Sequence, residues 1–422
     1  MKLSLKKAAV FSSLIIVTGF TALKIYAKTT TINEPQNAKW WSIQSIDTVK
    51  YSRDIAREKA KDTSFDQTID NQVRLIAETG ATHISLGTPY DKEFVPFLER
   101  WVKAARKYSL NVWFRGNFSG WEKWFGYSKI DREEHKRLTK DFIMANGKLF
   151  ENGDVFTACT ECENGGPGDP RQNGDVKGHR QFLIDEYKIT SVAFRNIDRN
   201  VRSNFFPMNG DVAKLVMDKE TTKALGGIVV IDHYVKSADK LVEDIKSLSR
   251  SSGGKIVLGE FGAPIPDIHG SMTESEQASW LSETLEKLIE SEDLIGVNYW
   301  TNTGGSTELW NGKLVERGAA ETLKDFYMPK TISGVIINEL KRPISGATVT
   351  LGPRSITTTT NGTFTIPGLS GIAQIEVSAK GYSDNMVEIL ANYANAPIVL
   401  QKQKPGLIYR ITSLLLRLVG KI

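Results

Sequence analysis

Carboxylates stand at the ends of two apolar, strand-like runs, where rigid backbone could hold them for chemistry. One run ends in Glu260, within the sequence Gly259-Glu260-Phe261-Gly262, and the other leads into Glu161 and Glu163. If both runs are strands of one barrel, they are the seventh and the fourth, on opposite sides of its mouth. Opposed carboxylates can cleave a glycosidic bond, because one protonates the leaving oxygen while the other attacks or stabilises the anomeric carbon.

Two acids compete for the position on the fourth run. Period-two alternation along an extended strand puts Glu161 and Glu163 on one face, together with Thr157 and Cys159. Glu161 is the stronger candidate because it lies nearer the strand, whereas Glu163 lies nearer the loop that follows.

The chain has only two cysteines, Cys159 and Cys162, and they flank Glu161. Residues three apart on an extended strand lie on opposite faces roughly 10 Å apart, beyond the ~7 Å limit for a disulfide, so only a tight turn would join them. A zinc site would need further ligands, and none of the five His follows either Cys in a ligand spacing. We therefore expect unpaired cysteines that are buried or line the site, and no metal.

An imidazole and a phenol follow a third strand-like run, Ile231-Asp232-His233-Tyr234. At the mouth of a barrel, His233 could orient a carboxylate and Tyr234 could hydrogen-bond the nucleophile. His83 instead begins its run, which predicts a structural position at the far end of the barrel.

Aromatic rings gather at the same ends of the predicted strands, and the apolar faces of sugars stack on such rings. The candidates for sugar stacking are Trp41, Tyr90, Trp121, Trp124 and Trp300. Arg115 and Asn117 follow the third run and could bind sugar hydroxyls or hold a carboxylate ionised, and Asn164 is a further candidate substrate contact. The tryptophans expected in the core are Trp40, Trp101 and Trp280.

Residues 39–328 must position these side chains, and there the sequence alternates short apolar runs with amphipathic helical stretches eight times. The predicted strands are 40–46, 83–87, 111–115, 154–161, 204–208, 227–233, 255–260 and 294–300. The clearest predicted helices are 65–79, 91–108, 132–145, 178–197 and 273–292. About 290 residues in eight such units predict a (β/α)₈ TIM barrel, with its active site at the carboxyl ends of the strands.

An open doubly wound sheet is the alternative fold for this region. Such a sheet normally carries a glycine-rich phosphate turn after its first strand. The sequence after Ile46 reads Asp47-Thr48-Val49-Lys50 and has no glycine, which favours the barrel.

Residues 331–403 have a different texture, with Thr-, Ile- and Val-rich runs broken by Gly, Pro and Asn, which predicts a small all-β immunoglobulin-like sandwich. The stretches that begin Ser333-Gly334-Val335-Ile336, Pro343-Ile344-Ser345-Gly346 and Ala379-Lys380-Gly381-Tyr382 resemble the carboxypeptidase-regulatory-like module. The resemblance implies a spacer or adhesion unit, and this segment holds no cluster of catalytic residue types.

The two ends of the chain carry much of its positive charge. Residues 1–28 place three lysines before an apolar run, which predicts either a cleaved signal peptide or a retained membrane anchor. Residues 404–422 form a predicted basic amphipathic helix, which could lie on an anionic membrane surface or dock on the protein body. These patterns predict an exported protein, either anchored at the cell surface or secreted.

Composition excludes other classes of protein. The 422 residues are 40% hydrophobic and 24% charged, which is ordinary globular composition, and two cysteines cannot build a disulfide scaffold. The net charge of +5 arises largely at the termini, so the near-neutral middle makes a nucleic-acid partner unfavourable.

Residues 40–328 resemble the clan A glycoside hydrolases, the cellulase-like family five and its relatives. The resemblance is carried by Gly259-Glu260-Phe261-Gly262, His233-Tyr234 and Tyr299-Trp300. It implies a retaining mechanism with Glu260 as nucleophile and the fourth-strand Glu as acid/base. The clan usually has Asn directly before the acid/base, whereas here Thr160 precedes Glu161 and Cys162 precedes Glu163, so either Glu fits that role.

The sequence thus predicts a retaining glycosidase acting on a β-linked polysaccharide or oligosaccharide, without cofactor or metal. A retaining pair requires the Glu260 carboxylate about 5–5.5 Å from that of Glu161 or Glu163. One alternative is a non-catalytic glycan-binding protein on the same scaffold. Another, a metal-dependent barrel hydrolase, is disfavoured because His83, His233 and His269 fall on different units without ligand spacing.

Overall fold

The computed structural model describes residues 39–352, 354–369, 372–391 and 396–403. The predicted signal or anchor at 1–28 and the predicted helix at 404–422 lie outside the described residues. Within the described ranges, no helix is both long and apolar enough to cross a membrane.

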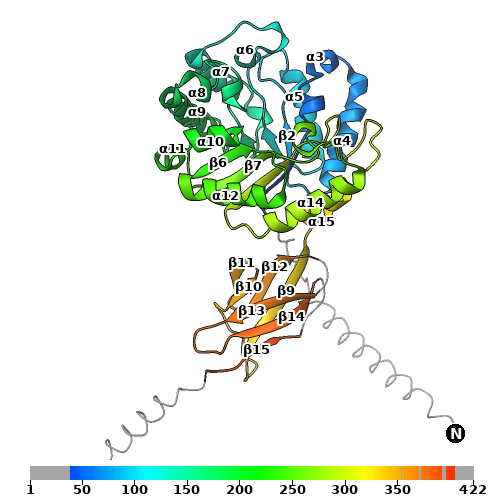
Figure 1. Ribbon diagram of the computed structural model, residues 1–422, viewed down its shortest axis with the longest axis vertical. Helices are drawn as coiled ribbons and strands as arrows, with labels where there is room; N and C mark the ends of the chain where they lie inside the picture. Colours follow the sequence, from blue (N-terminus) through cyan, green and yellow to red (C-terminus); the bar gives the residue numbers. More distant parts are fainter. Residues whose placement is uncertain (1–38, 353, 370–371, 392–395, 404–422) are drawn as a thin grey trace, which may run out of the picture. The chain divides into compact units, whose positions relative to one another are not determined.

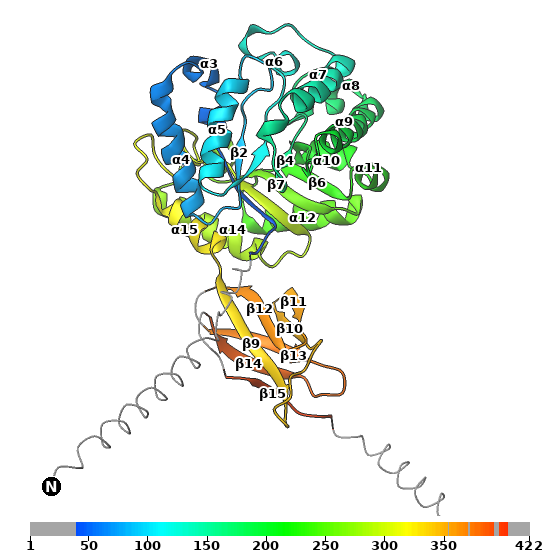
Figure 2. The same cartoon turned by 180° about the vertical axis from the view of Figure 1, so that it is seen from behind.

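Eight parallel strands form the first domain, ringed by helices (Figures 1 and 2). They are β1 Ile43–Asp47, β2 His83–Leu86, β3 Asn111–Phe114, β4 Val155–Phe156, β5 Pro207–Asn209, β6 Ile228–Asp232, β7 Lys255–Phe261 and β8 Leu294–Tyr299. Their order is β4-β3-β2-β1-β8-β7-β6-β5. Arg202 closes the ring, because its backbone bridges to the strand β4 at Val155. The predicted (β/α)₈ barrel is confirmed.

The helices follow the strands in alternation and cover the outside of the ring (Figure 1). They are α2 Val49–Ser52, α3 Ala56–Lys59, α4 Asp66–Glu78, α5 Val95–Lys107, α6 Ser119–Glu122, α7 Arg132–Ala145, α8 Pro170–Asn173, α9 Val176–Asn196, α10 Gly210–Val216, α11 Lys219–Ala224, α12 Ala238–Ser252, α13 Pro266–His269, α14 Glu274–Leu288 and α15 Gly318–Tyr327. Local sequence explains their ends: Asp131 caps α7 by accepting from the Glu134 amide, and Thr273 and Glu276 form a capping box on α14.

The interior of the barrel changes from apolar to polar along each strand. Its apolar layer includes Ile43, Trp113, Val230 and Val257, which pack on one another in the middle of the ring. Since inward-facing residues recur every second position, the next inward positions toward the carboxyl ends carry polar side chains or glycine. These positions are Ser45, Arg115, Asp232 and Gly259, and Asp47 follows two residues after Ser45 at the end of β1.

The second domain is a β-sandwich, as predicted. Its strands are β9 Lys330–Asn338, β10 Thr348–Leu351, β11 Arg354–Thr357, β12 Thr363–Gly368, β13 Ile372–Ser378, β14 Asn385–Leu390 and β15 Ile398–Leu400. One sheet has the order β11-β10-β13-β14 and the other β12-β9-β15, in which β15 runs parallel to β9. Their inner faces share a core that includes Ile336, Val349, Phe364 and Val377.

The fourth strand is much shorter than the predicted 154–161. β4 ends at Phe156, and the chain then turns, with Glu161 in the left-handed region (φ 44°) directly before the 3₁₀ helix η4, Cys162–Asn164. The expectation that Thr157, Cys159, Glu161 and Glu163 alternate along one strand face is therefore wrong. Period two applies only to extended backbone, and this segment is a turn.

Candidate active site

A buried guanidinium joins the carboxyl ends of four strands. Arg115 follows β3, and its side chain is 2% exposed. Its Nη1 donates to Asp47 Oδ2 at 3.2 Å and to the Gly259 carbonyl at 2.6 Å. Its Nη2 donates to Asp232 Oδ2 at 2.8 Å and lies 3.2 Å from Glu260 Oε1. Three carboxylates thus surround one cation at the predicted mouth.

Glu260 is the member of this set that remains accessible, with its side chain 18% exposed. The Tyr234 hydroxyl donates to its Oε2 at 2.8 Å. Burial raises the pKa of Glu260 to about 7, helped by the negative charges of Glu161 and Asp47 and opposed by Arg115 and by the Tyr234 hydrogen bond.

Asp47 is held more completely than its neighbours. Its Oδ2 accepts from Ser85 Oγ at 2.8 Å and from Asn298 Nδ2 at 3.3 Å, and its Oδ1 accepts from the Val49 amide at 2.6 Å. With Arg115, these make four donors. Asp47 and Asp232 were not singled out from the sequence, although each is the last residue of its strand, a criterion that would have found both.

The two cysteines are joined, which corrects the expectation of unpaired thiols. Cys159 and Cys162 form a disulfide, with their Cα atoms 5.3 Å apart. The ~10 Å separation assumed an extended strand, whereas the chain turns after β4. The disulfide therefore closes the turn that carries Glu161.

Glu161 and Glu163 occupy different environments on this turn. Glu161 is half-buried and accepts from Asn164 Nδ2 at 3.1 Å, while Asn164 itself is exposed. Glu163 is buried, and its Oε1 accepts from the Asn209 amide at 2.8 Å. Burial raises the pKa of Glu163 to about 7, against the opposing effect of the Asn209 amide.

His233 does not contact Glu260 through its side chain, unlike Tyr234. Its Nε2 lies 3.0 Å from Asp244 Oδ2 on α12, so the imidazole connects β6 to a covering helix. The expectation that His233 orients a catalytic carboxylate is corrected. His83, predicted to be structural, begins β2 in a buried position, with its Nε2 3.2 Å from the Gly153 carbonyl.

Three aromatic residues proposed for sugar stacking are enclosed in the core. Trp41 precedes β1, at the opposite end of the barrel from the mouth, and is 2% exposed. The Tyr90 ring packs between other rings, and its hydroxyl donates to the Thr157 carbonyl at 2.7 Å. Trp121 stacks on Phe182. Their ring faces are occupied by protein, so the prediction that they stack on sugar is wrong.

Two of the proposed aromatic residues keep partial exposure. Trp300 follows β8, and its ring centroid lies 6.1 Å from that of Tyr234. Trp124 lies in the loop after β3, with the Arg53 guanidinium 4.8 Å from its ring centroid. Trp300 is therefore the candidate sugar platform beside Tyr234, whose hydroxyl donates to Glu260.

A buried hydrogen-bond chain ends at a third carboxyl, Glu122, which the sequence did not reveal. Asn117 Nδ2 donates to Glu122 Oε1 at 2.5 Å, and Asn117 Oδ1 lies 2.9 Å from His135 Nε2. His135 Nδ1 in turn lies 2.6 Å from Glu186 Oε1. Asn117 is fully buried, so it acts on Glu122 rather than on a sugar hydroxyl. Burial, with the charges of Glu161 and Glu163, raises the pKa of Glu122 to about 8.

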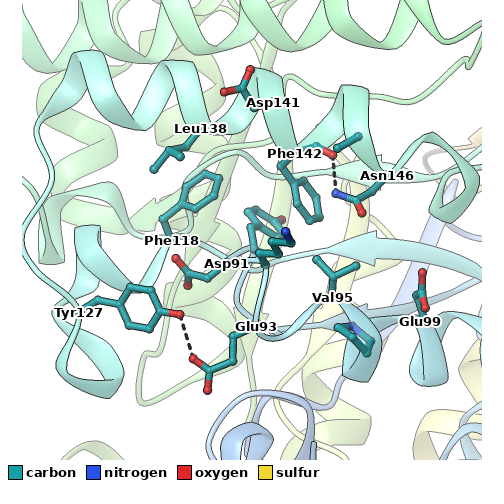
Figure 3. Close-up of a pocket in the computed structure, with 14 residues that line it drawn as sticks. Asp91, Glu93, Val95, Glu99, Phe118, Tyr127, Leu138, Asp141, Phe142 and Asn146 are labelled. Carbon is teal, nitrogen blue, oxygen red and sulfur yellow. Dashed lines mark hydrogen bonds between the residues drawn. The ribbon is translucent and has the colours of Figure 1, made fainter.

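A separate cavity of about 640 Å³ is lined by residues of α5, α7 and the loops before α5 and after β3 (Figure 3). Its apolar lining includes Val95, Phe118 and Leu138. Its carboxylates have partners: Asp91 accepts from Ser119, and Glu93 accepts from Tyr127. None of the three candidate catalytic Glu residues lines this cavity.

Comparison with known proteins identifies the second domain. Residues 331–401 match the family model of the carboxypeptidase regulatory-like domain. No curated protein matches the chain. The regulatory-like domain accounts for the sandwich and leaves the barrel to be compared by structure.

Several solved glycosidases match this chain at low sequence identity. A GH5_18 protein from Bifidobacterium longum subsp. longum, in complex with Manβ1-4GlcNAc, has 14% identity and a TM-score of 0.49, covering 72% of this chain and 86% of its own. A GH2 β-galacturonidase from Eisenbergiella tayi has 17% identity and a TM-score of 0.46, covering 68% of this chain and 51% of its own. An FMN-binding β-glucuronidase from Faecalibacterium prausnitzii has 10% identity and a TM-score of 0.45, covering 82% and 54%. The chain spans about half the length of the last two, so its activity has to be argued from its own residues.

Proposed function

We propose that this chain is a retaining glycoside hydrolase that cleaves O-glycosidic bonds of a β-linked glycan with two Glu carboxylates. The observation that carries the proposal is the environment of Glu260 at the end of β7. Arg115 and Tyr234 hold both of its oxygens, and the negative charge of Glu161, on the turn after β4, raises its pKa. A fixed carboxylate facing a second one is the minimum that glycoside hydrolysis requires.

Glu260 would act as the nucleophile. Ionised Glu260 attacks the anomeric carbon and forms a glycosyl ester, while the acid/base protonates the leaving oxygen. In the second step the acid/base removes a proton from water, and the water oxygen attacks the same carbon and releases Glu260. Arg115 and Tyr234 favour the ionised nucleophile, since charged and hydrogen-bond donors stabilise a carboxylate.

The acid/base must hold a proton near neutral pH, which burial of a carboxyl favours. Glu163 meets this condition through its burial. Glu161 is more accessible than Glu163, and its negative charge raises the pKa of Glu260. Both are therefore candidates. Replacing the acid/base by Ala should leave a site in which added azide restores turnover, since azide needs no base to attack the glycosyl ester. If azide does not restore turnover to the Ala variant of one Glu, that Glu is excluded as the acid/base.

The test of the function is an activity screen over β-glucans, mannans, xylans and chitin-like polymers with wild type and Glu260→Gln. We expect Glu260→Gln to lose at least a thousandfold in kcat while keeping its fold and its glycan binding, because the amide cannot form the ester. Glu283→Gln, an exposed position on α14, is the matched control and should match wild type. Hydrolysis undiminished in Glu260→Gln would exclude the nucleophile.

The rival function, glycan binding without catalysis, is separated by the same screen. A wild type that binds a glycan and hydrolyses none of the polymers would support it. Export and attachment at the cell surface, or secretion, are part of the proposal and rest on residues 1–28; fractionation of cells that make the full chain tests them.

A further inference from the structure

Asp232 is a buried carboxyl for which the proposed mechanism gives no role. It ends β6 and is 4% exposed. The cation it faces is shared, because Arg115 also contacts Asp47 and Glu260. One positive charge cannot balance three negative charges in a buried place, and a proton on one of these carboxyls lowers the net charge of the set from −2 to −1.

The hydrogen-bond donors distinguish the three carboxyls. Asp47 accepts from four donors: Arg115, Ser85, Asn298 and the Val49 amide. Asp47 is therefore the carboxyl of the three with the most complete set of hydrogen-bond donors.

Glu260 has a partner on each oxygen: the Tyr234 hydroxyl donates to Oε2, and the Arg115 guanidinium lies 3.2 Å from Oε1. Asp232 accepts from Arg115 on Oδ2, while its buried Oδ1 has no hydrogen-bond partner among the described residues. The carboxyl with an unpartnered oxygen loses least when it takes up a proton.

The surroundings of Asp232 Oδ1 leave little room for another donor. A Cβ placed on Gly259 would lie 2.3 Å from this oxygen, so Oδ1 packs directly against the backbone of β7. Any larger residue at 259 would displace the carboxyl. Gly259 therefore lets Asp232 approach, and its own carbonyl accepts from Arg115 and Asn298.

We propose that Asp232 carries a proton in the folded protein at neutral pH and acts as a positioning residue that leaves Arg115 free to keep Glu260 ionised. The charged groups that face it are Arg115, Glu260, Glu161 and Glu163, and burial, with the last three, raises its pKa well above the ordinary range. The protonation state of Asp232 does not depend on the proposed glycosidase activity; only its benefit to Glu260 does.

The proposal has a direct consequence for folding. In the unfolded chain an Asp has an ordinary pKa near 4 and is ionised at neutral pH. If folded Asp232 holds a proton, the chain therefore takes up one proton when it folds. Stability is then lost as the pH rises above about 4, and the folding equilibrium constant falls by about tenfold per pH unit from this group alone. Asp232→Asn removes that proton while keeping the shape and the acceptor of the protonated acid.

The experiment is urea unfolding of the whole chain between pH 5 and pH 8, with Asp232→Asn and Asp47→Asn as a matched pair. We expect Asp232→Asn to fold as well as wild type at pH 7. The folding equilibrium constant of the variant should fall with rising pH less steeply than that of wild type, by a factor of about ten per pH unit. Asp47→Asn should be strongly destabilised, because its amide nitrogen would face donors. An unchanged pH dependence in Asp232→Asn, or a greater loss at pH 7 than in Asp47→Asn, would overturn the proposal.

A second measurement covers the case in which Asp232→Asn fails to fold. Infrared spectra of protein labelled with ¹³C at its Asp carboxyls separate protonated from ionised groups. We expect a protonated band at pH 7 in wild type that survives in Asp91→Asn, because Asp91 is the other described Asp whose pKa is raised by burial. Absence of the band from wild type, or its complete loss in Asp91→Asn, would refute a protonated Asp232. Neither measurement uses a glycan, so a failure here differs from a failure of the activity screen.

Discussion

Replacing Arg115 by Met tests whether one guanidinium holds the mouth of the barrel together. The substitution keeps an unbranched, buried side chain and removes only the charge and its donors. Arg115 is 2% exposed, and its Nη atoms lie 2.8–3.2 Å from carboxylates on β1, β6 and β7. Removing one member of such a buried ionic set costs about 3–5 kcal/mol, because the partners are left charged and unpaired.

The loss of stability in Arg115→Met should depend on pH, because removing Arg115 changes the pKa values of the carboxyls that remain. Without Arg115 the pKa values of Glu260 and Asp232 rise further, because Arg115 opposes the effect of burial on both carboxyls. The folded variant then binds more protons than folded wild type. Its deficit should therefore be largest at pH 8 and shrink toward pH 5, by up to about 1.4 kcal/mol per pH unit for each proton gained.

Urea unfolding followed by tryptophan fluorescence measures both effects. Arg57→Met is the control, since Arg57 pairs with Glu93 at the surface and solvent already screens that pair. A deficit below about 1 kcal/mol at pH 7 would contradict a buried ionic centre of this kind. So would a deficit that is constant from pH 5 to pH 8.

Two further predictions concern the residues around the catalytic candidates. Cys159→Ser should lower the free energy of unfolding by about 2 kcal/mol, which is the loop entropy of a four-residue disulfide ring. If two thiols can be alkylated in wild type that has been unfolded without a reductant, the bond between Cys159 and Cys162 is absent. Tyr234→Phe should move the acidic limb of kcat/KM upward from near pH 7 by about one unit, because the Tyr234 hydroxyl lowers the pKa of Glu260 and activity needs the ionised form; an unmoved limb would show that this hydrogen bond does not control ionisation.

Much of the barrel was predictable because periodicity is a local signal. The predicted helix 132–145 has the bounds of α7, and strands β2, β3, β7 and β8 lie within a residue or two of the predicted ranges. Glu260 and Tyr234 were found for the same reason, since a polar residue after an apolar strand stands out in sequence.

The wrong predictions fall where tertiary structure overrides the local sequence pattern. The run after Phe156 alternates as a strand would, but the Cys159–Cys162 bond and the left-handed Glu161 show that it turns. Glu122 lies on a four-residue helix without periodicity, and only its contact with Asn117 brings it into the site. Trp121 was misplaced because sequence does not tell an exposed ring from one stacked on a distant helix.

The polar layer at the mouth is hard to explain by folding alone. Below it, Trp113 and Val230 belong to a well-packed apolar layer, and two residues further along the same strands stand Arg115 and Asp232. Apolar residues of similar volume at those positions would make the barrel as stable or more so, because buried ions seldom recover their desolvation cost. The strand β7, which pairs with β6, brings Glu260 to the same mouth, where Arg115 and the Tyr234 hydroxyl contact its carboxylate. A barrel that keeps a costly set of buried carboxyls around an accessible one is therefore better explained by chemistry at Glu260 than by stability.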